Sequence, residues 1–96
     1  MKVATVKKMQ ALANQGYHFV RVSGYYQPEE LLPDQIDSRL DTLADTPAYR
    51  SRPQLRSGQR QFLVVINAHG DVVVTLWLGG RKYERLLNLK LDQLLA

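Results

Sequence analysis

Four arginines that lie close together in the sequence could bind phosphate groups. The segment 46–70 contains no acidic residue, and its basic residues are Arg50, Arg52, Arg56 and Arg60. Each guanidinium presents a planar fork of N–H donors that matches two oxygens of one phosphate. Several such contacts would make the affinity for a nucleic acid depend strongly on salt. We therefore expect this segment to contact a nucleic acid or another anionic partner, such as an acidic protein. The alternative is a solvated loop.

The preceding segment carries the opposite charge. Between Glu29 and Asp45 there are six acidic residues and one basic residue, Arg39. At helical spacing five of these acids, from Glu30 to Asp45, form one ridge about 140° away from an apolar stripe. The stripe consists of Leu32, Ile36, Leu40 and Leu43, and the acids considered for protein contact are Asp34, Asp37, Asp41 and Asp45. This ridge could bind a basic protein, could pair with the arginine segment, or could be a solvated helix face.

Aromatic residues offer a further candidate interface. Tyr25 and Tyr26 follow a glycine, and a partly exposed position there suits contact with a partner or stacking on bases. Trp77 could also stack on a base. It lies in an apolar run, however, so we expect it to pack in the core.

The sequence shows no pattern typical of a metal site or of nucleophilic catalysis. His18 and His69 are the only histidines, there is no cysteine, and neither histidine has a partner at metal-ligand spacing. A G-x-S-x-G motif is missing, and the segment 78–81 lacks the Lys-Ser/Thr that follows a phosphate-binding glycine loop. We expect His18 to be packed or surface-facing and His69 to be exposed in a turn. We also expect a non-enzymatic protein without metal or cofactor.

Length and composition indicate one small domain. The chain has 96 residues, a net charge of +4 and no cysteine, which fits a single globular unit and excludes a disulfide framework. A chain this short buries roughly 60–65% of its unfolded surface, so dimerisation would add stability. The apolar runs are too short to cross a bilayer, and the N-terminal segment lacks the continuous apolar core of a signal peptide. We expect a cytoplasmic protein without a membrane partner.

The first half of the chain predicts a helix, a strand and a second helix. Apolar residues recur at helical spacing over residues 3–15, and Gly16 can end that helix. The β-branched and aromatic segment Tyr17–Ser23 predicts a strand, which as an exposed edge could pair two copies in a homodimer. Pro28 followed by two glutamates is typical of a helix start. It predicts an acidic helix that ends at Thr46-Pro47. Pro33 either breaks the opening turn from the rest of this helix or lies in the first turn of a longer one.

The second half predicts a polar loop followed by antiparallel strands. Residues 48–59 form the loop, residues 61–67 and 72–78 form two strands around a turn at 69–71, and Gly79-Gly80 predicts a tight hairpin. We expect a third strand over 81–87 and a short final helix, although Tyr83, Leu87, Leu91 and Leu94 also have helical spacing. These elements predict an α+β fold in a single domain, with an N-terminal helix, an amphipathic acidic helix and an antiparallel β-meander.

The C-terminal half resembles the sheet of RelE/ParE-type toxins. The resemblance rests on these segments: Arg56-Ser57-Gly58-Gln59-Arg60, Phe62–Ile66, Val72-Val73-Val74 and Gly80-Arg81-Lys82-Tyr83. In that family an R-x-G-x-R motif leads into a strand, a valine-rich strand follows, and a basic segment with a tyrosine leaves the sheet. Asp37–Pro47 resembles the helix that precedes this sheet. The chain differs in opening with a helix, where the family normally opens with a strand.

The resemblance implies a ribosome-dependent mRNA endonuclease. In the ribonuclease members, arginines that enter the sheet and the basic and tyrosine residues that leave it cleave mRNA. Arg60, Arg81 and Tyr83 would occupy such positions here, with Lys82 between the last two. Three hypotheses follow: a regulatory interaction protein that uses the arginine segment, a toxin of this type, or a protein-binding inhibitor that uses the acidic helix face.

Overall fold

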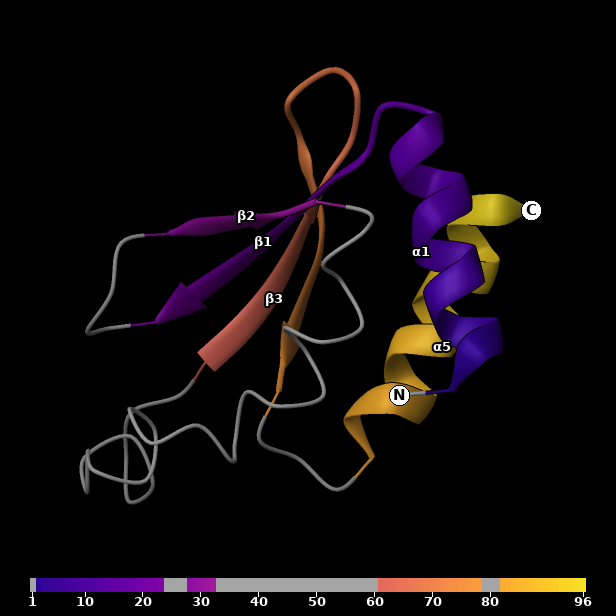
Figure 1. Cartoon of the computed structure of the whole chain (residues 1–96). Coiled ribbons are helices and arrows are strands. Elements are labelled where there is room, and N and C mark those ends of the chain that lie inside the picture. Colours follow the sequence, from indigo (N-terminus) through magenta and orange to yellow (C-terminus); the bar gives the residue numbers. More distant parts are fainter. Residues whose placement is uncertain (1, 24–27, 33–60, 79–81) are drawn as a thin grey trace.

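Two helices pack on one side of a four-stranded antiparallel sheet in the computed structural model of the chain (Figure 1). The structure describes residues 2–23, 28–32, 61–78 and 82–96. The elements are, in chain order, α1 (Val3–Asn14), β1 (His18–Ser23), β2 (Glu29–Leu31), β3 (Gln61–Ile66), β4 (Val72–Trp77) and α5 (Tyr83–Leu95). The predicted α+β class is confirmed.

The strands lie in the order β2-β1-β3-β4, and every neighbouring pair is antiparallel. One row of inward-facing residues crosses all four strands. Phe19 lies opposite Leu31 on one side and opposite Val65 on the other, and Val65 in turn lies opposite Val74. β1 is therefore an interior strand, and the prediction that Tyr17–Ser23 forms an exposed edge is wrong. The two edges are β2 and β4.

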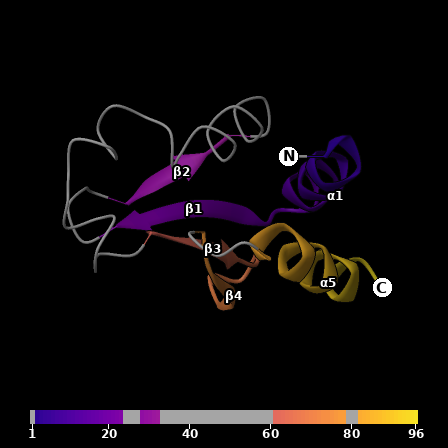
Figure 2. The ribbon, with the colours of Figure 1, turned by 90° about the horizontal axis from the view of Figure 1, so that it is seen from below.

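The core lies between this inward sheet face and the two helices, which run side by side (Figures 1 and 2). In β3 the burial alternates strictly, so that Leu63 and Val65 are buried while their neighbours are half-buried. The helices contribute buried side chains three or four positions apart, namely Met9 and Leu12 from α1 and Leu87 and Leu91 from α5. The two periods, of two in a strand and 3.6 in a helix, thus place apolar residues on facing surfaces.

Helix α1 ends where the sequence predicts it. Gly16 has a φ of +97°, its N–H donates to the carbonyl of Ala13 at 3.1 Å, and the N–H of Tyr17 donates to that of Leu12 at 3.1 Å. This pair of bonds is the Schellman arrangement, in which glycine is favoured. A Cβ at Gly16 would also approach the Cβ of Ala68 to 3.0 Å. Gly16 therefore both ends the helix and allows the β3–β4 turn to lie against it.

The β3–β4 hairpin also forms as predicted. The side-chain oxygen of Asn67 accepts hydrogen bonds from the backbone N–H groups of His69 and Asp71, each at 2.9 Å. Gly70 supplies the positive φ of +87° that the turn requires. His69 is exposed, as expected. Trp77 is not in the core as predicted, because 43% of it is exposed on the sheet face opposite the helices.

The predicted helix start at Pro28 is wrong, since Glu29–Leu31 forms strand β2. Leu31 is buried opposite Phe19, and Glu29 lies opposite Arg21, which binds it. These two inward contacts favour the extended conformation over the local preference for a helix. Leu32, the first residue of the predicted apolar stripe, follows β2 and is 50% exposed. The rest of the predicted acidic helix lies outside the described residues.

The predicted third strand of the meander is also wrong, because residues 83–95 form the single helix α5. Leu87 and Leu91 are completely buried, whereas Leu89 between them is 53% exposed. A strand would place all three side chains on one face, but a helix separates Leu89 from the other two. The buried pair packs in the same core cluster as Met9 and Leu12 of α1.

Leucine-to-alanine substitutions in α5 distinguish these two conformations. We expect Leu87→Ala and Leu91→Ala each to lower the free energy of unfolding by about 2–5 kcal/mol, because each removes a buried side chain and leaves a cavity. Leu89→Ala is the matched control and should cost less than about 0.5 kcal/mol. Denaturant unfolding followed by circular dichroism measures all three. An equal cost at Leu89 would contradict the helix.

Candidate functional site

Four strand ends meet at one end of the sheet, which we call the Gln61 end. Ser23, the last residue of β1, lies opposite Gln61, the first residue of β3. The N–H of Leu78, directly after β4, donates to the carbonyl oxygen of Gln61 at 2.8 Å. β2 begins here as well, because Glu29 lies opposite Arg21. The Gln61 end therefore comprises Ser23, Glu29, Gln61 and Leu78 (Figure 1, where the β1 arrow ends).

Several of the predicted site residues adjoin this end in the sequence. Arg60 directly precedes Gln61, Tyr25 and Tyr26 follow Ser23, and Arg81 falls between Leu78 and α5. These residues lie outside the described part of the chain, as do the other predicted contacts Arg50, Arg52, Arg56, Asp34, Asp37, Asp41 and Asp45. The antiparallel topology nevertheless brings together the strand ends to which the basic segments and the tyrosine segment are attached.

Lys82 and Tyr83 are the predicted contact residues that the structure describes. Lys82 is exposed at the position immediately before α5. Tyr83 is the first residue of α5 and packs, partly buried, against the core. Tyr83 therefore helps to anchor α5 to the core. Lys82, which directly precedes Tyr83, is an exposed cation.

Sequence reasoning missed an ion pair at the Gln61 end. Arg21 Nη2 donates to Glu29 Oε2 at 2.7 Å, and their side chains are only 18% and 30% exposed. Both residues lie on the inward face, because Arg21 is also opposite the buried Leu63. The alternation that places Phe19 inward also places Arg21 inward, and this was the signal available in the sequence. The pair holds the short strand β2 against β1.

Gln61 is the second polar group that the sequence did not predict here. It is only 5% exposed, and its side-chain oxygen Oε1 finds no hydrogen-bond donor within the described structure. An unpaired buried acceptor costs about 1–3 kcal/mol. The inward face is therefore apolar beneath the helices and becomes polar at the Gln61 end, where Arg21, Glu29 and Gln61 replace leucine and valine.

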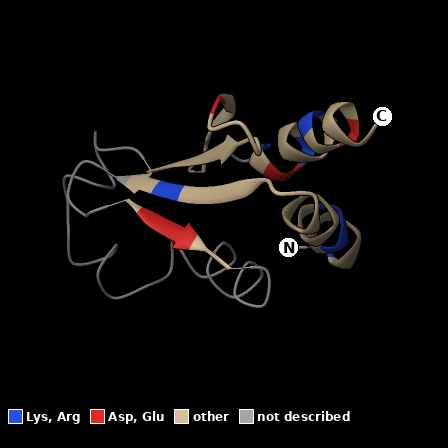
Figure 3. Ribbon diagram, turned by 90° about the horizontal axis from the view of Figure 1, so that it is seen from above, with Lys and Arg blue, Asp and Glu red and all other residues tan. Residues whose placement is uncertain are grey.

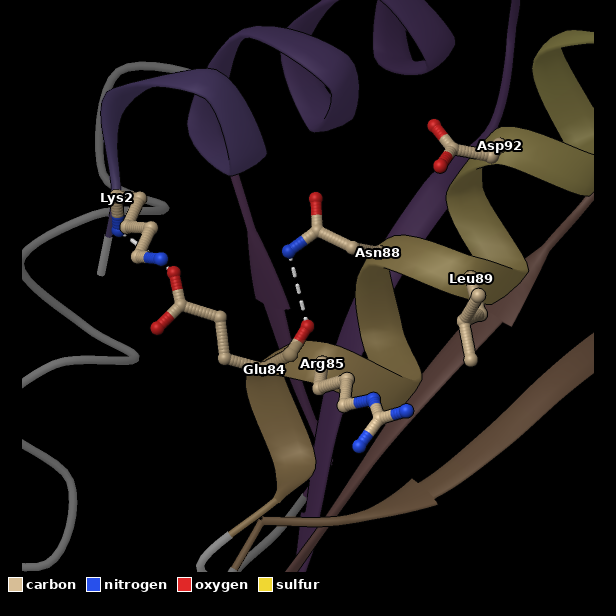
Figure 4. Close-up of a pocket in the computed structure, with 6 residues that line it drawn as sticks. All are labelled: Lys2, Glu84, Arg85, Asn88, Leu89 and Asp92. Atoms are coloured by element: carbon tan, nitrogen blue, oxygen red, sulfur yellow. Dashed lines mark hydrogen bonds between the residues drawn. The ribbon is translucent and has the colours of Figure 1, made fainter.

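A groove of about 330 Å³ lies beside the N-terminal part of α5 (Figure 4). Two polar side chains of its lining, those of Glu84 and Asn88, are already engaged. Glu84 Oε1 accepts a hydrogen bond from the backbone N–H of Lys2 at 2.6 Å and one from the Thr5 hydroxyl at 3.1 Å. Asn88 donates to the Thr5 hydroxyl at 2.8 Å and to the Glu84 carbonyl at 2.9 Å. These bonds join α1 to α5, so we assign the groove a structural role.

The sheet face opposite the helices is apolar, and we call it the open face. No described element packs on it. Its central residues Val20, Val22, Phe62, Val64 and Ile66 are half-buried, while Val72 and Trp77 are 60% and 43% exposed. Among the described residues, the ionisable side chains on this face are those of His18 and Glu30, which bond to each other near the β2 edge. Figure 3 shows that β3 and β4 carry no charged residue.

Two broader properties of the described residues bear on function. Nowhere in segments 2–23, 28–32, 61–78 and 82–96 do three or more potential His, Cys, Asp or Glu ligands gather into a metal-binding group. In the same segments, neither helix combines the length and the apolar character needed to cross a bilayer.

Double-mutant cycles should rank the two ion pairs that join β1 to β2. We expect a coupling of about 1–2 kcal/mol between Arg21 and Glu29, because both partners are largely shielded from water and the bond is charge-assisted. The matched control is His18 with Glu30, whose side chains are 55% and 51% exposed. Its coupling should stay below about 1 kcal/mol and fall with added salt. Alanine variants and denaturant unfolding give both values, and a larger coupling for the exposed pair would contradict this ranking.

Comparisons with protein-family models, with curated protein sequences and with solved structures find no match for this chain. The resemblance to RelE/ParE-type toxins therefore stays a prediction that rests on sequence motifs.

Proposed function

We propose that the protein is a small non-enzymatic interaction protein that binds an anionic partner, in the first place a nucleic acid, at the Gln61 end of its sheet. The observation that carries this proposal is topological. The strand ends that adjoin Arg60, Arg81 and the tyrosine pair Tyr25-Tyr26 all lie at that end. These segments are distant from one another in the sequence, yet they adjoin the same end of the sheet.

The charge distribution supports the same end of the sheet. The segment that leads to Gln61 carries four arginines and no acid, and Lys82 adds an exposed cation after β4. Glu29, the acid described at this end, is already bound to Arg21. The residues that adjoin this end in the sequence are therefore predominantly basic, which favours association with polyanions.

The residue types suit a nucleic acid better than an acidic protein. Arginine forks bind phosphate oxygens in pairs, and neighbouring tyrosines can stack on unpaired bases. An acidic protein would use the arginines alone. We therefore propose single-stranded RNA or DNA as the preferred class of partner.

Charge-removing variants test this proposal directly. Binding of a labelled single-stranded oligonucleotide is measured by fluorescence anisotropy over a range of salt concentrations. We expect Arg52→Ala with Arg56→Ala to weaken binding by about tenfold or more and to reduce the slope of log affinity against log salt by about 1.4, since two phosphate contacts are lost.

The control variant also removes two positive charges, but from the helices and not from the arginine segment. Lys7 and Lys90 are exposed on α1 and α5, and replacing both by alanine should change affinity by less than about twofold if the contact is local. The absence of binding by the wild type at low salt would reject the proposal. An equal loss in both double variants would reject the site.

A toxin of the RelE/ParE type is the second candidate. The described strands β3 and β4 carry two of the segments on which the resemblance rests, and the ends nearest to Arg60 and Arg81 lie together at the Gln61 end. This candidate predicts that induced expression arrests growth and cleaves mRNA, and that Arg81→Ala relieves both effects while Lys90→Ala does not. Harmless expression of the wild type would eliminate it.

A further inference from the structure

Gln61 carries a buried amide whose oxygen is unpaired among the described residues. Only 5% of the residue is exposed, and its side-chain Oε1 meets no donor in segments 2–23, 28–32, 61–78 and 82–96. The strict alternation of β3 places Gln61 on the inward face, in line with Leu63 and Val65. A leucine at this position would continue the apolar row without leaving a buried acceptor unpaired. The glutamine therefore calls for an explanation other than packing.

Two described donors close to Gln61 are used elsewhere. The backbone N–H of Leu78 donates to the backbone carbonyl oxygen of Gln61 at 2.8 Å, so it does not serve the side chain. Arg21 lies opposite Leu63 and is thus a diagonal neighbour of Gln61, within reach of a long side chain. Its Nη2 nevertheless donates to Glu29 at 2.7 Å. A ligand can supply the donor that these two groups do not.

We propose that Gln61 reads an unpaired base of a single-stranded nucleic acid at the Gln61 end, an inference that rests on the proposed function. A side-chain amide offers an acceptor and a donor side by side. A phosphate group cannot satisfy Oε1, because its oxygens only accept hydrogen bonds, whereas a base edge offers donors as well. Adenine is the best match, since glutamine pairs with its N6 amino group and its N7. Oε1 accepts from N6, and the amide nitrogen donates to N7.

This assignment gives the arginine segment and Gln61 different tasks. Phosphate contacts fix the position of a nucleic acid but carry no sequence information, and base contacts supply the specificity. The arginine segment ends directly before Gln61, so the two kinds of contact come from adjacent parts of the chain. The burial of Oε1 sharpens the selection. A base without a donor at this point leaves the acceptor unpaired and shielded from water, which lowers the affinity.

Two matched oligonucleotides test the base contact. One is a single strand of about 12 deoxyadenosines, and in the other purine, which lacks only the N6 amino group, replaces adenine. By fluorescence anisotropy we expect the wild type to bind the adenine strand at least about fivefold more tightly. Gln61→Leu should remove this preference. It should leave the slope of log affinity against log salt unchanged, because the phosphate contacts remain.

Denaturant unfolding separates this role from a structural one. Gln61→Leu should unfold at the same denaturant concentration as the wild type or at a higher one, because it removes an unpaired buried acceptor. Asn88→Leu is the matched control, since the Asn88 amide donates to Thr5 at 2.8 Å and to Glu84 at 2.9 Å. It should unfold at a lower concentration and keep the preference for adenine. Gln61→Met, which is unbranched like glutamine, gives a second test of the same position.

The outcomes distinguish the base contact from the proposed function. If the wild type binds both strands equally, the base contact is overturned while the proposed function stands, and an ordered water is then the partner of Oε1. A preference that survives in both Gln61 variants would overturn the role of Gln61. Lower stability of both variants would also overturn it, by showing that the amide serves the fold. Failure to bind either strand at low salt would reject the proposed function together with this inference.

Discussion

The pairing of β1 with β3 is the contact on which the rest of the structure depends. It runs without interruption from His18 opposite Ile66 to Ser23 opposite Gln61, although residues 24–60 separate the two strands in the sequence. Closing so long a segment costs entropy that the pairing must outweigh. Phe19 and Val65, opposite each other at its centre, are almost completely buried. β2 then pairs with the free side of β1, and β4 pairs with the free side of β3. The Gln61 end exists because the last residue of β1 lies opposite the first residue of β3.

The helices complete the core through a second long-range contact. α1 and α5 come from opposite ends of the chain, and Glu84 of α5 accepts the hydrogen bonds of Lys2 and Thr5 at the start of α1. Further along, Lys8 binds Asn88 at 3.1 Å and Asp92 at 2.8 Å. These successive contacts join the two helices in parallel over the sheet. The apolar faces of both helices are thereby held toward the same row of strand residues.

The resulting layout separates two kinds of surface. Polar and charged groups gather at the Gln61 end, where the inward face changes from leucine and valine to Arg21, Glu29 and Gln61. The described part of the open face is apolar apart from Thr75 and the His18–Glu30 pair near the β2 edge, and β4 carries no charge. A polar end suits a charged ligand, whereas an apolar edge suits another protein surface.

Local signals in the sequence determined the elements that are stabilised mainly by residues close together in the chain. The periodicity of residues 3–15 with Gly16, the alternation in 61–66, and the turn built by Asn67 and Gly70 each specify their own conformation, and the basic residues of the candidate site could be recognised from composition. Tertiary structure decided the rest. Glu29–Leu31 is a strand because Leu31 meets Phe19 and Glu29 meets Arg21, and 83–95 is a helix because Leu87 and Leu91 reach α1. The same long-range pairing placed Ser23, Gln61 and Leu78 together. Contacts between residues that are distant in sequence carry no local signal, so only the folded chain could show which end of the sheet the basic segments share.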